Sequence, residues 1–166
     1  MTHEMVSVVL PVRNCARTLV RSMKSALTQT YTNLEVIIIN DFSSDETAQI
    51  LASVTDARVR VLTNSVCSGA AESRNRGIQS SRGRYIAFLD GDDAWHPDKL
   101  ERQVAFFRTS RDSCGMVYTG YECVSGYARC SYEKVFAREI KTRNELFVTN
   151  CIGVLSSLMG ERRVFE

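Results

Sequence analysis

Three carboxylates follow a short apolar run in the middle of the chain. Residues Tyr85 to Leu89 lead directly into Asp90, Gly91, Asp92 and Asp93. Like charges this close together cost stability unless something positive neutralises them, and hard divalent cations prefer oxygen ligands. The cluster therefore indicates a metal site that holds a phosphate group, with Asp92 as the main ligand, with or without Asp90. An acidic surface turn is the alternative, because Asp and Gly are ordinary turn residues.

Polar residues also follow two other apolar runs. Pro11, Val12, Arg13 and Asn14 come after residues 6–10, and the segment 40–45 (Asn-Asp-Phe-Ser-Ser-Asp) comes after residues 34–39. Each cluster alone is explained by a turn or a helix cap. If the strands are parallel, however, all three clusters meet at one edge of a sheet, which favours a ligand crevice. There Asp41 is suited to accept hydrogen bonds from a nucleobase N–H or a ribose hydroxyl.

A fourth candidate segment runs from Ser68 to Gly77. Gly69 and the two alanines after it would let the backbone approach a ligand closely. Arg74 would meet a phosphate or a base. A solvated helix residue is the alternative reading of Arg74.

Alternating strand and helix patterns position these segments. Strands are predicted at 6–10, 34–39, 59–62 and 85–89, and helices at 16–27, from 44 to 54, at 70–79 and from 96 onward. This order predicts an α/β fold with a mostly parallel central sheet flanked by helices. After residue 113 we expect strands at 116–119 and 123–124, a short helix at 143–149 and a last strand at 154–159.

Composition narrows the function classes. The 166 residues fit one domain, and the formal net charge of +2 gives no indication of nucleic-acid binding. No apolar run reaches membrane-spanning length, and the first residues are not a signal peptide. None of the six cysteines forms a C-x-x-C pair, so free buried thiols in a reducing cytosol are expected rather than a zinc site. A disulfide among Cys114, Cys123 and Cys130 stays open.

An ordered set of motifs resembles family 2 glycosyltransferases over residues 5–110. The matching segments are 8–14 (VVLPVRN), 25–31 (SALTQTY), 35–41 (EVIIIND), 74–77 (RNRG), 89–93 (LDGDD) and 97–100 (PDKL). The resemblance implies a GT-A (Rossmann-like) fold that transfers a sugar, with inversion, from a nucleotide-diphosphosugar, most simply a UDP-sugar, using Mn²⁺ or Mg²⁺. It implies a glycan or lipid-linked acceptor, a role in cell-surface polysaccharide or glycolipid synthesis, and a cytoplasmic location, with peripheral association at the inner membrane face.

The resemblance also assigns roles to individual residues. Asp92 and Asp90 would bind the metal, whereas Asp93 would support the loop or cap the next helix. The donor would be bound by Pro11, Asn14, Asp41, Arg74 and Asp90. Pro11 would contribute its backbone, Asp41 would contact the base, and Asp90 would contact the nucleotide-sugar.

The chain departs from the family pattern at several positions. Arg13 stands where an aromatic residue is common, and Asn40 and Phe42 replace a usual Asp and a small residue, which bears on base preference. Trp95 would either face a sugar ring or pack in the core.

The catalytic base of the family belongs to an acidic motif that we expect beyond Glu166. Residues 162–166 resemble the strand that precedes that motif. We therefore expect a single domain, 1–166, truncated at its C-terminus, with a nucleotide-sugar part at about 5–113 and the start of an acceptor part at about 114–166.

Other functions remain as alternatives. One is a non-catalytic nucleotide-sugar-binding module or inactive fragment, and another is a nucleotidyltransferase, although no Gly- and Lys-rich loop follows the first strand. A dinucleotide-dependent oxidoreductase is disfavoured because no G-x-G-x-x-G follows that strand. The sugar, the acceptor and the oligomeric state are open.

Overall fold

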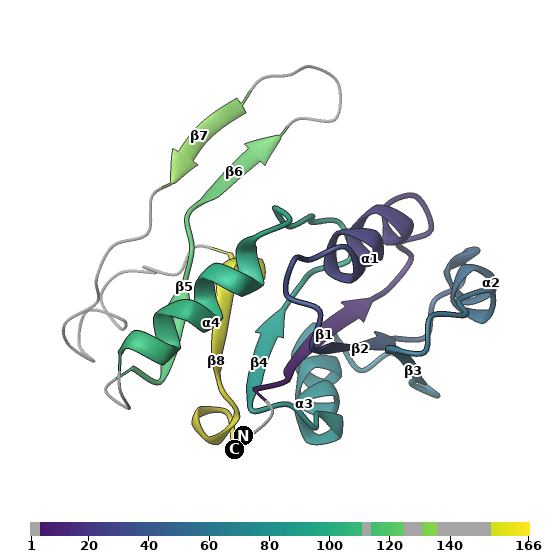
Figure 1. Cartoon of the computed structure of the whole chain (residues 1–166). Coiled ribbons are helices and arrows are strands. Elements are labelled where there is room, and N and C mark those ends of the chain that lie inside the picture. Colours follow the sequence, from purple (N-terminus) through teal and green to yellow (C-terminus); the bar gives the residue numbers. More distant parts are fainter. Residues whose placement is uncertain (1–3, 111–113, 125–130, 136–153) are drawn as a thin grey trace.

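The computed structural model describes residues 4–110, 114–124, 131–135 and 154–166 (Figure 1). Its main sheet has six strands in the order β3-β2-β1-β4-β8-β5. Their bounds are β1 (Val6–Val12), β2 (Leu34–Asn40), β3 (Val59–Thr63), β4 (Tyr85–Phe88), β5 (Met116–Tyr118) and β8 (Leu158–Glu161). Strands β1 to β4 run parallel to one another, whereas β8 is antiparallel to both β4 and β5. The predicted α/β fold with a mostly parallel sheet is confirmed.

Helices cover both faces of this sheet. They are α1 (Leu19–Leu27), α2 (Thr47–Ala52), α3 (Ala70–Ser80) and α4 (Lys99–Thr109). Apolar residues of α1 and α4 pack with Val8 and Leu10 on one face, and Ile78 of α3 packs with Val9 and Ile37 on the other. Every residue of β1 and β2 is buried, because strands covered on both faces need apolar residues at consecutive positions. The continuous apolar runs in the sequence have this cause.

Gly77 lets α3 lie close to the sheet. A Cβ atom at this position would come within 2.4 Å of Val9 Cγ1 and 2.9 Å of Ile39 Cδ1. Only a residue without a side chain fits there. Since Ser73 and Arg74 precede Gly77 by about one helical turn, this close approach also sets their distance from the end of β1.

The C-terminal part differs from the predictions in detail. The predicted strand 154–159 is wrong at its start: Leu155–Ser157 form a 3-10 turn, and the strand covers Leu158–Glu161. The segment read as a strand at 162–166 instead contains a 3-10 turn, Arg162–Val164. In the first turn, Ser156 bonds the loop after β4 rather than a neighbouring strand. The predicted helix at 143–149 lies outside the described residues.

A small hairpin stands apart from the main sheet. Strands β6 (Tyr121–Val124) and β7 (Ser131–Val135) pair antiparallel and project away from the body in Figure 1. They supply the additional C-terminal β element that was expected.

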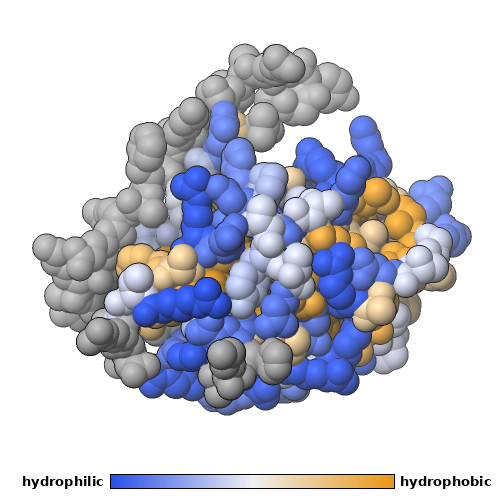
Figure 2. Space-filling view, in the orientation of Figure 1, coloured by the Kyte–Doolittle hydropathy of each residue, from blue (hydrophilic) through white to orange (hydrophobic). Residues whose placement is uncertain are grey.

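Hydrophilic residues cover most of the coloured surface in Figure 2, with apolar side chains in small groups between them. Of the helices that the structure describes, none has the length and apolar character needed to span a membrane.

Candidate functional site

The predicted site residues line one cleft at the carboxyl ends of β1, β2 and β4. This cleft has a volume of about 830 Å³. All six residues predicted to bind the donor or the metal contribute to its wall: Pro11, Asn14, Asp41, Arg74, Asp90 and Asp92. The ends of β1 and β2 are level, because Val12 pairs with Asn40 and the Val12 carbonyl accepts the N–H of Asp41 at 2.9 Å. The predicted convergence of separate strand ends is confirmed.

Helix α1 and the turn before it hold the loop after β4, residues 90–93, by its backbone carbonyls. Thr18 Oγ1 donates to the Gly91 carbonyl at 2.7 Å. Ser22 Oγ lies 2.9 Å from that carbonyl and 2.6 Å from the Asp93 carbonyl, and Arg21 donates to the carbonyl of Asp92. These contacts fix the backbone of the loop without using the carboxylate groups of its aspartates.

Ser156 fixes the same loop from the C-terminal part of the chain. Its hydroxyl accepts the N–H of Asp90 at 2.9 Å, and its carbonyl accepts the indole N–H of Trp95 at 2.7 Å. Trp95 is only 8% exposed, and the Nζ atom of Lys99 lies 4.1 Å from its ring centroid. Trp95 is therefore a core residue and does not face a sugar. The helix α4 begins after Asp98, so Asp93 is not its cap.

The two carboxylates predicted to bind metal have different surroundings. Asp90 Oδ1 accepts a hydrogen bond from Arg74 Nη2 at 2.6 Å, and the two side chains are 32% and 19% exposed. Asp92 is exposed, and its carboxylate makes no hydrogen bond or ion pair with any residue in the described ranges. Asp92 thus lines the cleft with a carboxylate that is available to a ligand.

Arg74 also carries a buried donor without an acceptor. Its Nε atom is buried and has no hydrogen-bond partner within the described part of the chain. Buried polar groups are nearly always paired, and an orphaned one calls for an explanation such as a ligand. Because Arg74 lines the cleft, this N–H marks a place for an anionic group.

Asp41 organises the loop between β3 and α3. Its Oδ1 accepts from Asn64 Nδ2 at 2.7 Å and from the N–H of Ser68 at 2.8 Å, and its Oδ2 accepts the N–H of Gly69 at 2.8 Å. Burial alone would raise the pKa of Asp41, but these hydrogen bonds outweigh it and lower the pKa. Gly69 has a φ of +87°, which favours glycine. The contact of Asp41 with a base stays a prediction. A base N–H would donate to a carboxylate that already accepts hydrogen bonds from the protein.

Two non-glycine residues near the cleft adopt left-handed backbone conformations. Asn14 has a φ of +51°, and its Oδ1 accepts the N–H of Ser44 at 2.9 Å, which ties the ends of β1 and β2 together. Phe42 has a φ of +54° and is 57% exposed. A bulky residue in this conformation is a genuine outlier. Its effect on base preference remains a prediction.

The cleft carries a slight excess of negative charge. Its wall includes four aspartates, of which Asp45 is the one not yet described, against three arginines: Arg13, Arg17 and Arg74. Burial raises the pKa of the Cys15 thiol, and the carboxylates of Asp92, Asp45 and Asp90 raise it further. A bound cation would offset this negative field.

The residues present suit a divalent cation that is shared with a phosphate. Within the described ranges, no three His, Cys, Asp or Glu side chains gather into a metal-binding group. Mg²⁺-type ions are usually held by one or two carboxylates together with substrate phosphates rather than by an all-protein cage. Asp92 and Asp90 supply two carboxylates, and the Arg74 N–H, which has no partner among the described residues, would suit a phosphate oxygen.

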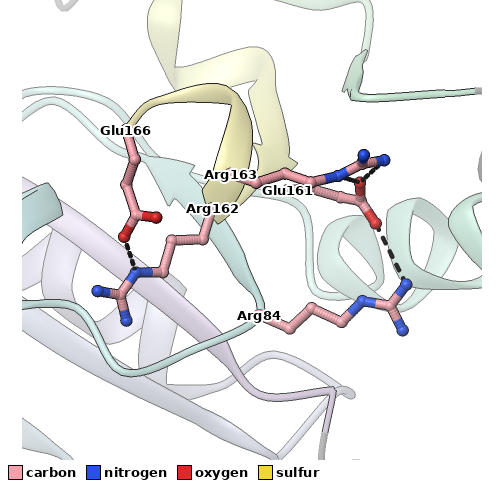
Figure 3. A pocket seen from close by; sticks show the side chains of 5 residues that line it. All are labelled: Arg84, Glu161, Arg162, Arg163 and Glu166. Carbon is pink, nitrogen blue, oxygen red and sulfur yellow. Dashed lines mark hydrogen bonds and ion pairs between the residues drawn. The ribbon is translucent and has the colours of Figure 1, made fainter.

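A second cleft of about 460 Å³ lies at the opposite end of the sheet (Figure 3). Its arginines are already paired: Arg84 and Arg163 both contact Glu161, at 3.2 and 2.6 Å, and Arg162 contacts Glu166 at 2.6 Å. Ligands of open α/β sheets bind at the carboxyl ends of the strands. We therefore assign this cleft a structural role.

The described cysteines are free, as predicted, but they are not buried: Cys67 and Cys123 are exposed, and Cys15 and Cys114 are half-buried. Cys15, Cys67, Cys114 and Cys123 are free thiols. Cys130 and Cys151 lie outside the described residues.

The sequence analysis missed the residues that hold the loop 90–93. Thr18, Ser22 and Ser156 do not belong to any motif that carries chemistry, yet they bond its backbone. One signal was present for Ser22, which occupies a position of the apolar stripe of α1 between Leu19 and Ala26 and is fully buried. A buried serine in such a stripe requires a hydrogen-bond partner.

Comparison with known proteins gives a consistent result. The family model described as "Glycosyl transferase family 2" matches residues 7–166. Two curated Escherichia coli relatives are UDP-Glc:alpha-D-GlcNAc-diphosphoundecaprenol beta-1,3-glucosyltransferases. WfaP is 42% identical over 65% of this chain and 43% of its own length. WfgD is 34% identical over 96% of this chain and 61% of its own length. The chain thus spans about half the length of these relatives.

Among solved structures, S. aureus TarS in complex with UDP-GlcNAc matches in fold. The TM-score is 0.78 at 20% sequence identity, over 96% of this chain and 46% of that chain. The expected GT-A fold is thereby confirmed.

Proposed function

The chain belongs to glycosyl transferase family 2, and on this premise we propose that it transfers a sugar from a UDP-sugar to an acceptor hydroxyl with inversion. The cleft at the ends of β1, β2 and β4 would be the donor site. One observation carries this proposal: among the residues that the structure describes, neither the carboxylate of Asp92 nor the buried Nε–H of Arg74 has a partner, and both residues line this cleft. A metal-bound diphosphate offers a cation to the first and an anion to the second.

Each part of the donor has a candidate partner in the cleft. Asp92, with Asp90, would hold Mn²⁺ or Mg²⁺, which when bound would stabilise charge on the departing diphosphate. Arg74 would bind a phosphate oxygen, since a guanidinium matches phosphate geometry. Pro11 and Asn14 would line the nucleoside side together with Asp41. The printed names of WfaP and WfgD specify UDP-Glc, which supports a UDP-sugar here.

The acceptor is proposed by analogy with the same relatives, whose names specify a lipid-linked GlcNAc diphosphate. Such an acceptor would place the reaction beside the cytoplasmic membrane and within cell-surface polysaccharide or glycolipid synthesis. Inversion requires a base that removes the proton of the acceptor hydroxyl. We propose that this base lies outside the donor cleft, and that residues 5–113 form the donor part and residues 114–166 begin the acceptor part.

Calorimetric titration with UDP tests the donor site directly. UDP should bind in the presence of Mn²⁺, and at least tenfold more weakly without it, because the diphosphate would then meet uncompensated carboxylates. GDP serves as the comparison for base preference. Asp92→Asn should remove the dependence on Mn²⁺, whereas the matched change Asp93→Asn, one residue further on, should retain it. UDP affinity that is the same with and without Mn²⁺ would refute the metal role.

Transfer itself is measured with radiolabelled UDP-Glc and a GlcNAc-diphospholipid acceptor. Product formation with inverted anomeric configuration would support the full proposal. Donor binding without any transfer would instead favour a nucleotide-sugar-binding module.

A further inference from the structure

We propose that Arg74 exchanges partners when the donor binds. In the free protein its guanidinium neutralises Asp90, and in the donor complex a divalent cation takes over Asp90 while Arg74 turns to the diphosphate. This inference rests on the proposed function of the cleft as a donor site. Arg74 would thereby take the place of the metal at Asp90 in the free protein. It would also couple metal binding to nucleotide binding.

Asp90 already has a cationic partner in the free protein. Arg74 Nη2 lies 2.6 Å from Asp90 Oδ1. A metal ion that uses this oxygen must displace the guanidinium. Because the two side chains are 19% and 32% exposed, solvent reaches this pair, and a divalent cation would attract the carboxylate of Asp90 with twice the charge of the guanidinium. Displacement by a divalent cation is therefore within reach.

Not all hydrogen-bond donors of Arg74 have an acceptor among the described residues of the free protein. A guanidinium has five N–H groups, and the buried Nε–H has no acceptor among the residues that the structure describes. Leaving a buried donor unpaired is costly. If diphosphate oxygens approach this N–H, that cost is removed. The donor complex therefore gives the guanidinium of Arg74 more hydrogen-bond acceptors than Asp90 alone provides.

Helix α3 is held in place by residues other than Arg74. The buried residues Ser73 and Gly77 anchor α3 against the sheet on either side of Arg74. The other nearby arginine of this helix, Arg76, donates instead to the Thr63 carbonyl and to Asn64 Oδ1. Arg74 is thus the arginine of α3 that lines the cleft.

The charges of the cleft favour the same exchange. A divalent cation at Asp92 and Asp90 would repel the adjacent guanidinium, and the diphosphate that accompanies it would attract it. Metal alone must compete with Arg74, whereas metal and nucleotide together give every charge a partner. The expected consequence is that Mn²⁺ binds weakly by itself and more tightly with UDP.

The test measures Mn²⁺ binding by electron paramagnetic resonance of the free ion, without nucleotide, on the whole chain. Arg74→Ala should bind Mn²⁺ about fivefold more tightly than the wild type, since the competing ion pair is gone. With saturating Mn²⁺ the same variant should bind UDP at least tenfold more weakly, because a charge-assisted hydrogen bond to the diphosphate is lost. Arg74→Gln provides a second neutral variant of similar length.

Two further variants serve as controls. Arg74→Lys keeps the positive charge and should leave Mn²⁺ affinity within about twofold of the wild type, while a single ammonium replaces the guanidinium fork poorly at the diphosphate. Arg102→Ala breaks another Arg–Asp pair, with Asp98 on the exposed side of α4, and should change neither affinity. Circular dichroism verifies the fold of each variant.

The outcomes separate this proposal from the proposed function. Tighter Mn²⁺ binding together with weaker UDP binding supports the exchange. If the neutral variants bind Mn²⁺ more weakly or equally well while the wild type still binds UDP with Mn²⁺, Arg74 merely positions Asp90 and the exchange is wrong. If the wild type does not bind UDP with Mn²⁺ at all, the donor site itself is wrong and the exchange falls with it.

Discussion

Gly77→Ala is expected to destabilise the protein even though alanine is the better helix former. In a helix interior alanine is favoured over glycine by roughly 1 kcal/mol. Against this, the added Cβ would lie 2.4 Å from Val9 Cγ1 and 2.9 Å from Ile39 Cδ1, both in fully buried side chains. Overpacking of this kind costs about 1–3 kcal/mol. Valine has a stiff χ1, so Val9 has little room to turn away and the cost belongs at or above the upper end.

The net loss is therefore about 2 kcal/mol. For a chain of this size it corresponds to a fall in Tm of roughly 4–8 °C. Urea unfolding measures the free energy, and Gln79→Ala, an exposed position of the same helix, is the matched control, which should gain a few tenths of a kcal/mol.

A double-mutant cycle checks the cause of this loss. Val9→Ala removes the nearest atoms that the new Cβ would meet and leaves the contact with Ile39 Cδ1, so Gly77→Ala should cost less, but not nothing, in that background. UDP affinity should also fall in Gly77→Ala, because α3 carries Arg74. An alanine variant as stable as the wild type, or strictly additive costs in the cycle, would refute the reasoning that close helix–sheet contact requires glycine here.

Two further predictions concern buried polar groups. Ser22→Ala removes the buried hydroxyl that bonds the carbonyls of Gly91 and Asp93. The free energy of unfolding should fall by about 1–3 kcal/mol, and Mn²⁺-dependent UDP binding should weaken. The exposed Ser53→Ala is its control in calorimetry, and unchanged UDP affinity in Ser22→Ala would contradict the loop-holding role. Burial lowers the pKa of Lys99 to about 7, so between pH 7 and about 10.5 the unfolded state binds more protons and stability rises with pH. Relative to Lys99→Met, the free energy of unfolding of the wild type should rise by up to about 1.4 kcal/mol per pH unit in that window. Urea unfolding at pH 6.5, 8 and 9.5 measures this difference. A difference that does not change with pH would argue against a neutral buried amine.

Much of the fold was predictable because the pattern of apolar residues is local. The buried strands β1 and β2 read as continuous apolar runs, and α1 reads as an apolar stripe, whatever surrounds them. The C-terminal strand was misplaced for the opposite reason. Residues 155–157 turn because Ser156 bonds Asp90 and Trp95, which are about sixty residues away, and no local pattern records such a partner.

The candidate site divides in the same way. Asp41, Arg74, Asp90 and Asp92 were proposed from the sequence because carboxylates at the ends of predicted strands and a guanidinium beside a glycine-containing segment suit a metal and a phosphate, with turns, caps and a solvated helix residue as the alternatives. That they share one cleft followed from the expected parallel sheet, and the structure confirms it. Their present partners did not follow. The Arg74–Asp90 pair, the loop bonds to Asp41 and the burial of Trp95 depend on how separate elements pack.

The sequence by itself thus determined the fold class, the family and the residues that supply charge, because these depend on residue type and on spacing along the chain. Tertiary structure decided which charges are already paired and which are free. Within the described part of the chain, the carboxylate of Asp92 and the Nε–H of Arg74 are left without partners after the separate elements have packed. Pairing of this kind is set by distances in space, which spacing along the chain does not contain.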